Sequence, residues 1–153
     1  MKVNLVKEAN SFLFFPKHNN MNNKILVIED NKYLAELIQV NLEANGFNVT
    51  TSFNGEDGLK KACTEMPDVI TLDVQLPKMD GWEVCRQIKA DLRTKDIPVV
   101  FLTVVPKEEG EKKARSAGCS LYLTKPFDPS KLADIIQDII ANRRINANIE
   151  NKL

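Results

Sequence analysis

Five short runs of apolar and β-branched residues recur along this chain, and each is followed by a segment with helical spacing of apolar residues. The runs are KILVIE (24–29), FNVTTSF (47–53), DVITLD (68–73), IPVVFLT (97–103) and CSLYLT (119–124). Short runs of this kind are typical of strands, and strands that alternate with helices form a parallel sheet covered on both faces. We therefore expect an α/β fold with a doubly wound, five-stranded parallel sheet.

Capping residues predict where the helices begin and end. Four residues suited to N-caps precede helical segments: Asn31, Asn54, Asp80 and Asp128. Gly46 and Gly118 are suited to the ends of the first and fourth helices. The apolar spacing predicts that the first helix turns four residues towards the core: Leu34, Leu37, Ile38 and Leu42.

A chain of 153 residues is long enough for one domain, and no linker interrupts residues 24–142. We expect residues 23–143 to form the domain, residues 1–22 to be a flexible N-terminal extension and residues 144–153 to be a polar C-terminal tail. The extension has only a four-residue apolar core, FLFF (12–15), which is too short for a signal peptide or a membrane span. An alternative for FLFF is that it covers an apolar patch.

Charge and cysteine usage exclude several classes of function. Lys plus Arg and Asp plus Glu number 21 each, so net charge gives no reason to bind nucleic acid or an anionic membrane. Cys63, Cys85 and Cys119 are widely spaced, and the chain has a single histidine, so a zinc site is not expected. We expect three reduced thiols in a cytoplasmic protein.

Polar residues stand where the predicted strands end. Glu29 and Asp30 follow the first strand, Asp73 ends the third, Thr103 ends the fourth and Lys125 follows the fifth. The carboxyl ends of parallel strands share one edge of the sheet, so these side chains should lie together. Three neighbouring carboxylates repel one another unless a cation lies among them, and oxygen ligands suit Mg²⁺ or Mn²⁺. Because bound Mg²⁺ usually also holds phosphate oxygens, we expect phosphoryl chemistry here.

Four segments carry a resemblance to a known family: ILVIEDN, DVITLDVQLPKMDGWEVCRQIK, IPVVFLT and YLTKPF. Together they resemble the receiver domain of two-component response regulators, over about residues 24–142. The resemblance implies a flavodoxin-like fold with strand order 2-1-3-4-5. It also implies a stand-alone signalling module similar to the chemotaxis regulators.

The resemblance assigns a role to each residue of the predicted site. Asp73 would be the phosphoacceptor, and Mg²⁺ (or Mn²⁺) would be held by Asp30, Asp73 and the backbone carbonyl of Gln75, with Glu29 acting through a bound water. Lys125, which precedes a cis proline bond in this family, would pair with Asp73 and then with the phosphoryl group. Thr103 and Tyr122 would form the switch, in which Tyr122 turns from solvent towards the core after phosphorylation.

The sequence departs from the usual pattern beside this site. Val104 stands where the family often has alanine or glycine, and we hypothesise that it narrows access and slows phosphotransfer from small donors and self-hydrolysis. Gln75 could orient an attacking water, whereas Val105 could not. Ser120 and Leu121 are not acidic, unlike residues there in receivers that dimerise through helix four, strand five and helix five. Leu121 is therefore expected to be an exposed docking residue or an isolated surface leucine.

The favoured function is a phosphorelay module, not an enzyme, that accepts a phosphoryl group from phosphohistidine on Asp73. Its partners would be a sensor histidine kinase or histidine phosphotransfer protein and an unknown downstream protein, without direct contact to nucleic acid or membrane. It would act as a monomer or weak dimer. The alternative is a receiver fragment of a larger regulator with a DNA-binding or enzymatic output domain. A phosphatase is disfavoured because Gln75 stands where such enzymes need a second acid.

Overall fold

The computed structural model describes residues 23–152, which form ten alternating strands and helices. The strands are β1 (Lys24–Ile28), β2 (Asn48–Ser52), β3 (Val69–Leu72), β4 (Val99–Thr103) and β5 (Leu121–Thr124). The helices are α1 (Lys32–Ala44), α2 (Gly55–Glu65), α3 (Gly81–Ala90), α4 (Lys107–Ser116) and α5 (Pro129–Lys152). The prediction of a flexible extension at residues 1–22 lies outside the described residues.

All strand pairs in the sheet are parallel, and the strand order is β2-β1-β3-β4-β5. The order reverses beside β1, since β2 lies on one side of it and β3 on the other. In the register, Ile28 at the end of β1 pairs with Leu72 at the end of β3. The residues that follow these two strands therefore emerge together at one edge, at the switch point where ligands bind in such sheets. The predicted fold and strand order are confirmed.

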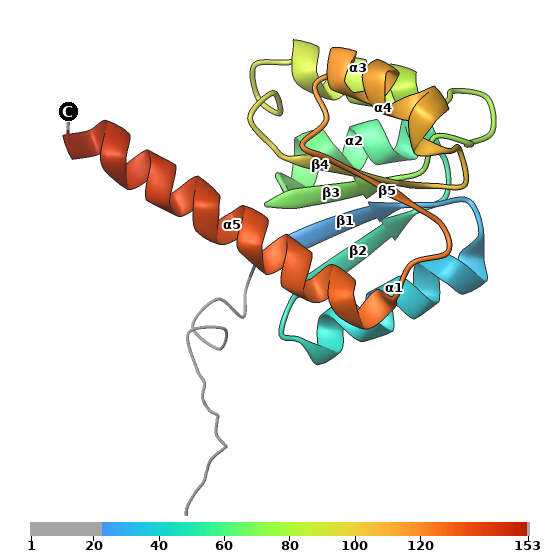
Figure 1. Cartoon of the computed structure of the whole chain (residues 1–153), viewed down its shortest axis with the longest axis horizontal. Helices are drawn as coiled ribbons and strands as arrows, with labels where there is room; N and C mark the ends of the chain where they lie inside the picture. The colour runs from blue at the N-terminus through green and yellow to red at the C-terminus, as the bar shows by residue number, and fades with distance from the viewer. Residues whose placement is uncertain (1–22, 153) are drawn as a thin grey trace, which may run out of the picture.

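Helices cover both faces of the sheet (Figure 1), with α2, α3 and α4 on one face and α1 and α5 on the other. Successive residues of β1 point to opposite faces: Leu26 and Ile28 pack towards α2 and α3, whereas Ile25 and Val27 pack towards α1 and α5. This two-sided burial explains why β1 and β4 are continuous apolar runs rather than alternating ones.

The predicted caps form hydrogen bonds at the helix starts. Asn31 Oδ1 accepts from the backbone N–H of Tyr33 and Leu34, and Asn54 Oδ1 accepts from Asp57. At the start of α3, Asp80 Oδ1 accepts from the backbone N–H of Glu83. These bonds satisfy donors that have no partner inside the helix.

Two predictions about apolar side chains were wrong. Leu37 of α1 was expected to face the core, but it is 47% exposed and Ala35 is buried instead. Leu121 was expected to be exposed, but it is half-buried and packs against the core beneath α1 and α5. For Leu37, the spacing of apolar residues did not show where the buried face of the helix ends. For Leu121, the expectation came from the lack of acidic residues, which does not show how far a residue of the edge strand β5 is covered.

Helix α5 runs to Lys152, through most of the segment 144–153 that was expected to be a polar C-terminal tail (Figure 1). No glycine or proline follows Pro129 in the sequence, so the strongest helix-breaking residues are absent from this segment. Where burial is described, up to residue 144, the buried residues of α5 are Leu132, Ala133, Ile136 and Ile140. Over the described residues, no helix combines the length and apolar character needed to cross a membrane.

Candidate functional site

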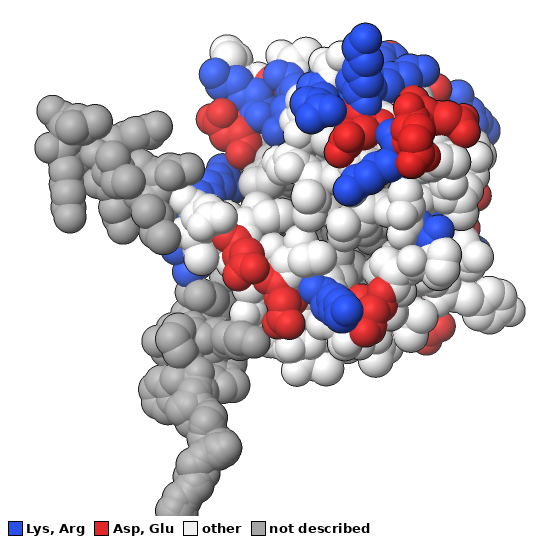
Figure 2. Space-filling view, in the orientation of Figure 1, with Lys and Arg blue, Asp and Glu red and all other residues white. Residues whose placement is uncertain are grey.

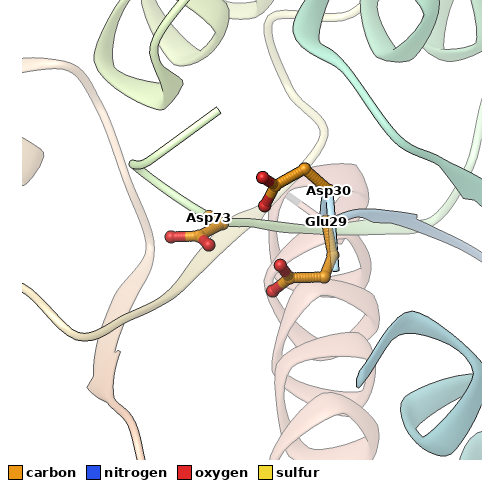
Figure 3. A group of neighbouring side chains, drawn as sticks. All are labelled: Glu29, Asp30 and Asp73. Atoms are coloured by element: carbon orange, nitrogen blue, oxygen red, sulfur yellow. The ribbon is translucent and has the colours of Figure 1, made fainter. Parts of the chain in front are cut away.

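Three carboxylates converge at the switch point of the sheet (Figure 3). Glu29 and Asp30 follow β1, and Asp73 follows β3. One carboxylate oxygen from each of the three lies within 4.8 Å of the others. Glu29 and Asp73 are buried, whereas Asp30 is exposed, so the cluster opens to solvent on the Asp30 side. The predicted gathering of acids is confirmed.

The ammonium group of Lys125 lies between two of these carboxylates. Lys125 Nζ donates to Glu29 Oε1 at 2.7 Å and to Asp73 Oδ2 at 3.0 Å. The Lys125–Pro126 peptide bond is cis, as the resemblance implied. The other carboxylate oxygen of Glu29 accepts from the backbone N–H of Asn31 at 3.1 Å. Glu29 therefore also holds the lysine. The role of Glu29 through a metal-bound water stays a prediction.

Burial and pairing act in opposite directions on the charges of this site. Burial raises the pKa of Glu29 above its usual value, although the hydrogen bond from Lys125 opposes this. Burial by itself would lower the pKa of Lys125, but the hydrogen bonds to Glu29 and Asp73 outweigh it, and the pKa is raised. The lysine is therefore a firmly protonated cation at neutral pH.

The loop after β3 is folded tightly against the backbone of Asp73. The backbone N–H of Gln75 donates to Asp73 Oδ1 at 3.1 Å, and Gly81 N–H donates to the Val74 carbonyl at 2.8 Å. A Cβ atom at Gly81 would lie only 2.7 Å from the Val74 Cα, so only glycine lets α3 start this close to the site. Gly81 is therefore required by the close packing of this loop.

Thr103 and Tyr122, the predicted switch pair, are connected through the backbone of Val105. The Val105 N–H donates to Thr103 Oγ1 at 3.2 Å, and the Tyr122 hydroxyl donates to the Val105 carbonyl at 2.7 Å. Thr103 is fully buried and Tyr122 is 3% exposed. A movement of the Thr103 hydroxyl would therefore act on the same peptide segment that holds Tyr122.

The side chain of Tyr122 points into the core in this structure. Its ring lies parallel to that of Trp82, with centroids 6.4 Å apart and planes 4° apart, and it lies 6.1 Å from the Phe101 ring. Burial raises the pKa of Tyr122 above its usual value. The sequence predicted a tyrosine that starts in solvent, so the inward position is a difference between prediction and structure.

The residues expected to control access lie on the loops around the carboxylates. Val104 is 55% exposed and follows Thr103 directly, Gln75 is exposed, and Val105 is half-buried against the core.

The three cysteines are free, as expected, and burial raises the pKa of Cys85 to about 11. On the face seen in Figure 2, acidic and basic side chains are mixed over α3 and α4, without a stripe of one sign.

This arrangement of acids, lysine and threonine at the end of a β2-β1-β3-β4-β5 sheet agrees with a sequence comparison. The sequence profile of the response regulator receiver domain matches residues 25–137. The chain belongs to this family. The receiver is 41% identical over 127 residues to the alkaline phosphatase synthesis transcriptional regulatory protein PhoP of Bacillus subtilis, an alignment that covers 83% of this chain and 52% of PhoP.

Solved receiver structures have the same fold. The receiver domain of the sensor histidine kinase PA1611 of Pseudomonas aeruginosa, solved with a magnesium ion coordinated in its active site cleft, has a TM-score of 0.72 and 30% identity, covering 78% of this chain and 98% of that one. The BeF3-activated receiver domain of DrrB from Thermotoga maritima has a TM-score of 0.69 and 35% identity, covering 77% and 97%. The chain spans about half the length of curated relatives such as PhoP.

Sequence reasoning missed three contacts near the site: the Glu29–Lys125 pair, the stacking of Trp82 on Tyr122, and the contact of Gly110 with Tyr122. Trp82 is buried, at 7% exposure. The one available signal was Gly110 itself, because a glycine inside a helical pattern often has a packing reason.

Proposed function

We propose that this receiver accepts a phosphoryl group on Asp73 from a phosphohistidine. The observation that carries the proposal is Lys125, whose ammonium contacts Asp73 Oδ2 at 3.0 Å from a position 52 residues later in the chain. A cation fixed beside one carboxylate oxygen suits the stabilisation of phosphoryl charge. Asp73 Oδ1 is held by the Gln75 N–H, so the carboxylate has a defined orientation.

The donor set fits a hard divalent cation. Three carboxylates offer oxygens within 4.8 Å of one another, and the exposed Asp30 leaves a side open for water and phosphate oxygens. Asp30 and Asp73 would hold Mg²⁺ (or Mn²⁺) with the Gln75 carbonyl, and Glu29 would contact it through water. When bound, the ion would offset negative charge on the acids and on the transferred phosphoryl group.

The chain's own residues supply position and charge for the transfer. A carboxylate oxygen of Asp73 attacks phosphorus, the phosphorus–nitrogen bond to the donor imidazole breaks, and an acyl phosphate forms. The ammonium group of Lys125, which contacts the Asp73 carboxylate before the transfer, would then contact a phosphoryl oxygen. We propose that the receiver is not an enzyme in its own right, since its own side chain is the acceptor.

Thr103 would detect the phosphoryl group through a hydrogen bond. Its hydroxyl, which accepts from the Val105 N–H, can donate to a phosphoryl oxygen and draw the end of β4 towards Asp73. The linked backbone of Val105 would carry this movement to Tyr122, on the face formed by α4, β5 and α5. That face would bind a downstream protein, and the donor would be a sensor histidine kinase or phosphotransfer protein.

A second candidate follows from the partial coverage of the curated relatives. PhoP is by name a transcriptional regulatory protein, and this chain covers 52% of it. The receiver could therefore act within a longer regulator, whose output domain would be the target of the α4, β5 and α5 face.

The proposal is tested by NMR with Mg²⁺ and beryllofluoride, a mimic of the phosphoryl group. We expect shifts at Asp73 and Thr103 that extend to α4 and β5, and none of these in Asp73→Ala. If the mimic binds but the NMR shifts of α4 and β5 are unchanged, the proposed switch is wrong. If it does not bind with Mg²⁺ present, the phosphoacceptor site itself is wrong.

A further inference from the structure

Tyr122 lies in a closed packing site, called the seat below, whose walls are Trp82, Phe101, the Val105 carbonyl and Gly110. Its ring stacks on Trp82 from α3, contacts Phe101 from β4, and its hydroxyl donates to the Val105 carbonyl in the loop before α4. The fourth wall is Gly110 of α4, a buried residue. The seat therefore surrounds both the ring and the hydroxyl of Tyr122.

Gly110 has no room for a side chain while Tyr122 is in the seat. A Cβ atom there would lie 2.7 Å from Tyr122 Cζ, and the hydroxyl oxygen would be closer still. Real Cβ atoms do not approach other atoms so closely, so the ring would have to move.

The backbone gives no other reason for glycine at this position. The positive-φ glycines of the described residues are Gly46 and Gly118, so Gly110 has a conformation open to any residue. Inside a helix, glycine costs about 1 kcal/mol of stability relative to alanine. The contact with Tyr122 is the feature of the structure that accounts for this cost.

Trp82 supplies the opposite wall and is itself held in place. Its ring lies 5.0 Å from that of Phe101, and Lys113 Nζ of α4 lies 5.4 Å from the Trp82 ring centroid. Trp82 also follows Gly81, which packs against the backbone next to Asp73. The seat is therefore attached to the loop that carries the proposed phosphoacceptor.

We propose that Gly110 and Trp82 are positioning residues that set the balance between inward and outward Tyr122. Gly110 acts by leaving space for the phenol, and Trp82 acts by stacking on its ring. This inference rests on the proposed role of Tyr122 as the switch residue. It adds the two residues that determine whether the Tyr122 side chain points inward or outward.

The position of Tyr122 can be measured directly, because the chain has only two tyrosines. Tyr33 is 87% exposed and serves as an internal reference. In protein with ¹³C-labelled tyrosine rings, a soluble paramagnetic probe should broaden Tyr33 and spare Tyr122. In Gly110→Ala we expect the inward-to-outward ratio of Tyr122 to fall by about tenfold or more, so that the probe broadens both tyrosines. A Tyr122 signal that stays protected would overturn the proposal.

A matched control separates crowding from a change in helix propensity. Ser116→Ala adds no contact with Tyr122, because Ser116 is exposed at the end of α4, and it should leave the Tyr122 signal unchanged. Trp82→Leu removes the stacking partner and should also expose Tyr122, without any added bulk on α4. Exposure in Ser116→Ala, or continued protection in Trp82→Leu, would contradict the roles given to Gly110 and Trp82.

A double variant keeps the test decisive if Gly110→Ala unfolds the domain. In a Tyr122→Leu background the hydroxyl and most of the ring are gone, so Gly110→Ala should no longer destabilise the fold. Equal destabilisation in both backgrounds would mean that the added methyl group clashes elsewhere, and the inference would fall. These measurements need no phosphate, so their failure is distinguishable from a failure of Asp73 to accept one.

Discussion

Lys125 and Glu29 form an ion pair of 2.7 Å across 96 residues of sequence, shorter than the 3.0 Å pair between Lys125 and Asp73. The lysine side chain is 15% exposed, and the two carboxylates are buried. The ammonium therefore stabilises two acids that would otherwise repel each other in a poorly hydrated place.

Replacing Lys125 with methionine should leave two neighbouring buried carboxylates unpaired. We expect a loss of about 2 kcal/mol in the free energy of unfolding at pH 7 without divalent cations, less than for a fully enclosed pair because the site opens to solvent at Asp30. Urea unfolding measures it. Lys131→Met, which changes an exposed lysine of α5, is the control, and an equal effect in both variants would rule out a special role for Lys125.

Asp30→Asn should have opposite effects in the absence and presence of Mg²⁺. Without the ion, the change removes one of three crowded negative charges and should stabilise the domain by about 0.5–1 kcal/mol. With millimolar Mg²⁺, wild type should gain thermal stability and the variant should gain little. Glu36→Gln, at an exposed acid of α1, should behave as wild type. An undiminished Mg²⁺ effect in Asp30→Asn would exclude Asp30 as a ligand.

Thr71 and Thr94 offer a matched pair of buried hydroxyl groups. Thr71 Oγ1 has no hydrogen-bond partner among residues 23–152, whereas Thr94 Oγ1 donates to the Ile88 carbonyl at 2.7 Å. Thr71→Val should therefore raise the free energy of unfolding by about 1 kcal/mol, and Thr94→Val should lower it by about 1 kcal/mol. Denaturant titration of the two variants checks this. Destabilisation of the same size in both would mean that Thr71 makes a hydrogen bond after all.

Val104→Ala should shorten the lifetime of the acyl phosphate. The β-branched side chain follows Thr103 directly and should hinder the approach of water to the phosphoryl group. We expect about threefold faster loss of phosphate, which corresponds to about 0.6 kcal/mol in activation free energy. The decay is followed by intact mass spectrometry, with Val40→Ala on the exposed face of α1 as control. A longer lifetime in Val104→Ala would contradict the hypothesis.

The site could be predicted because its residues stand at strand ends. Asp73 and Thr103 follow apolar runs that can only be core strands, and a parallel sheet brings such ends to one edge. The pairing of Lys125 with Glu29 could not be predicted, because it depends on how far a glutamate side chain reaches across that edge. Sequence pattern places a residue on an edge but does not choose among carboxylates within reach.

The exact extent of the elements was less predictable than their order. The fourth strand was expected at 97–103, but β4 is Val99–Thr103, since an apolar run does not show where ladder pairing begins. The role of Gly110 could not be predicted either, because its partner Tyr122 belongs to a different element, β5. The sequence of α4 is otherwise typical of a charged surface helix. Contacts between elements distant in the chain need the packed structure.

Intact mass spectrometry after incubation with acetyl phosphate and Mg²⁺ tests the phosphoacceptor assignment most directly. The account predicts one labile phosphate on wild type and none on Asp73→Asn, which keeps the shape of the side chain but removes its nucleophilic carboxylate. Phosphate retained by Asp73→Asn, or absent from wild type with every small donor and phosphohistidine donor tried, would contradict the assignment of Asp73 as the phosphoacceptor.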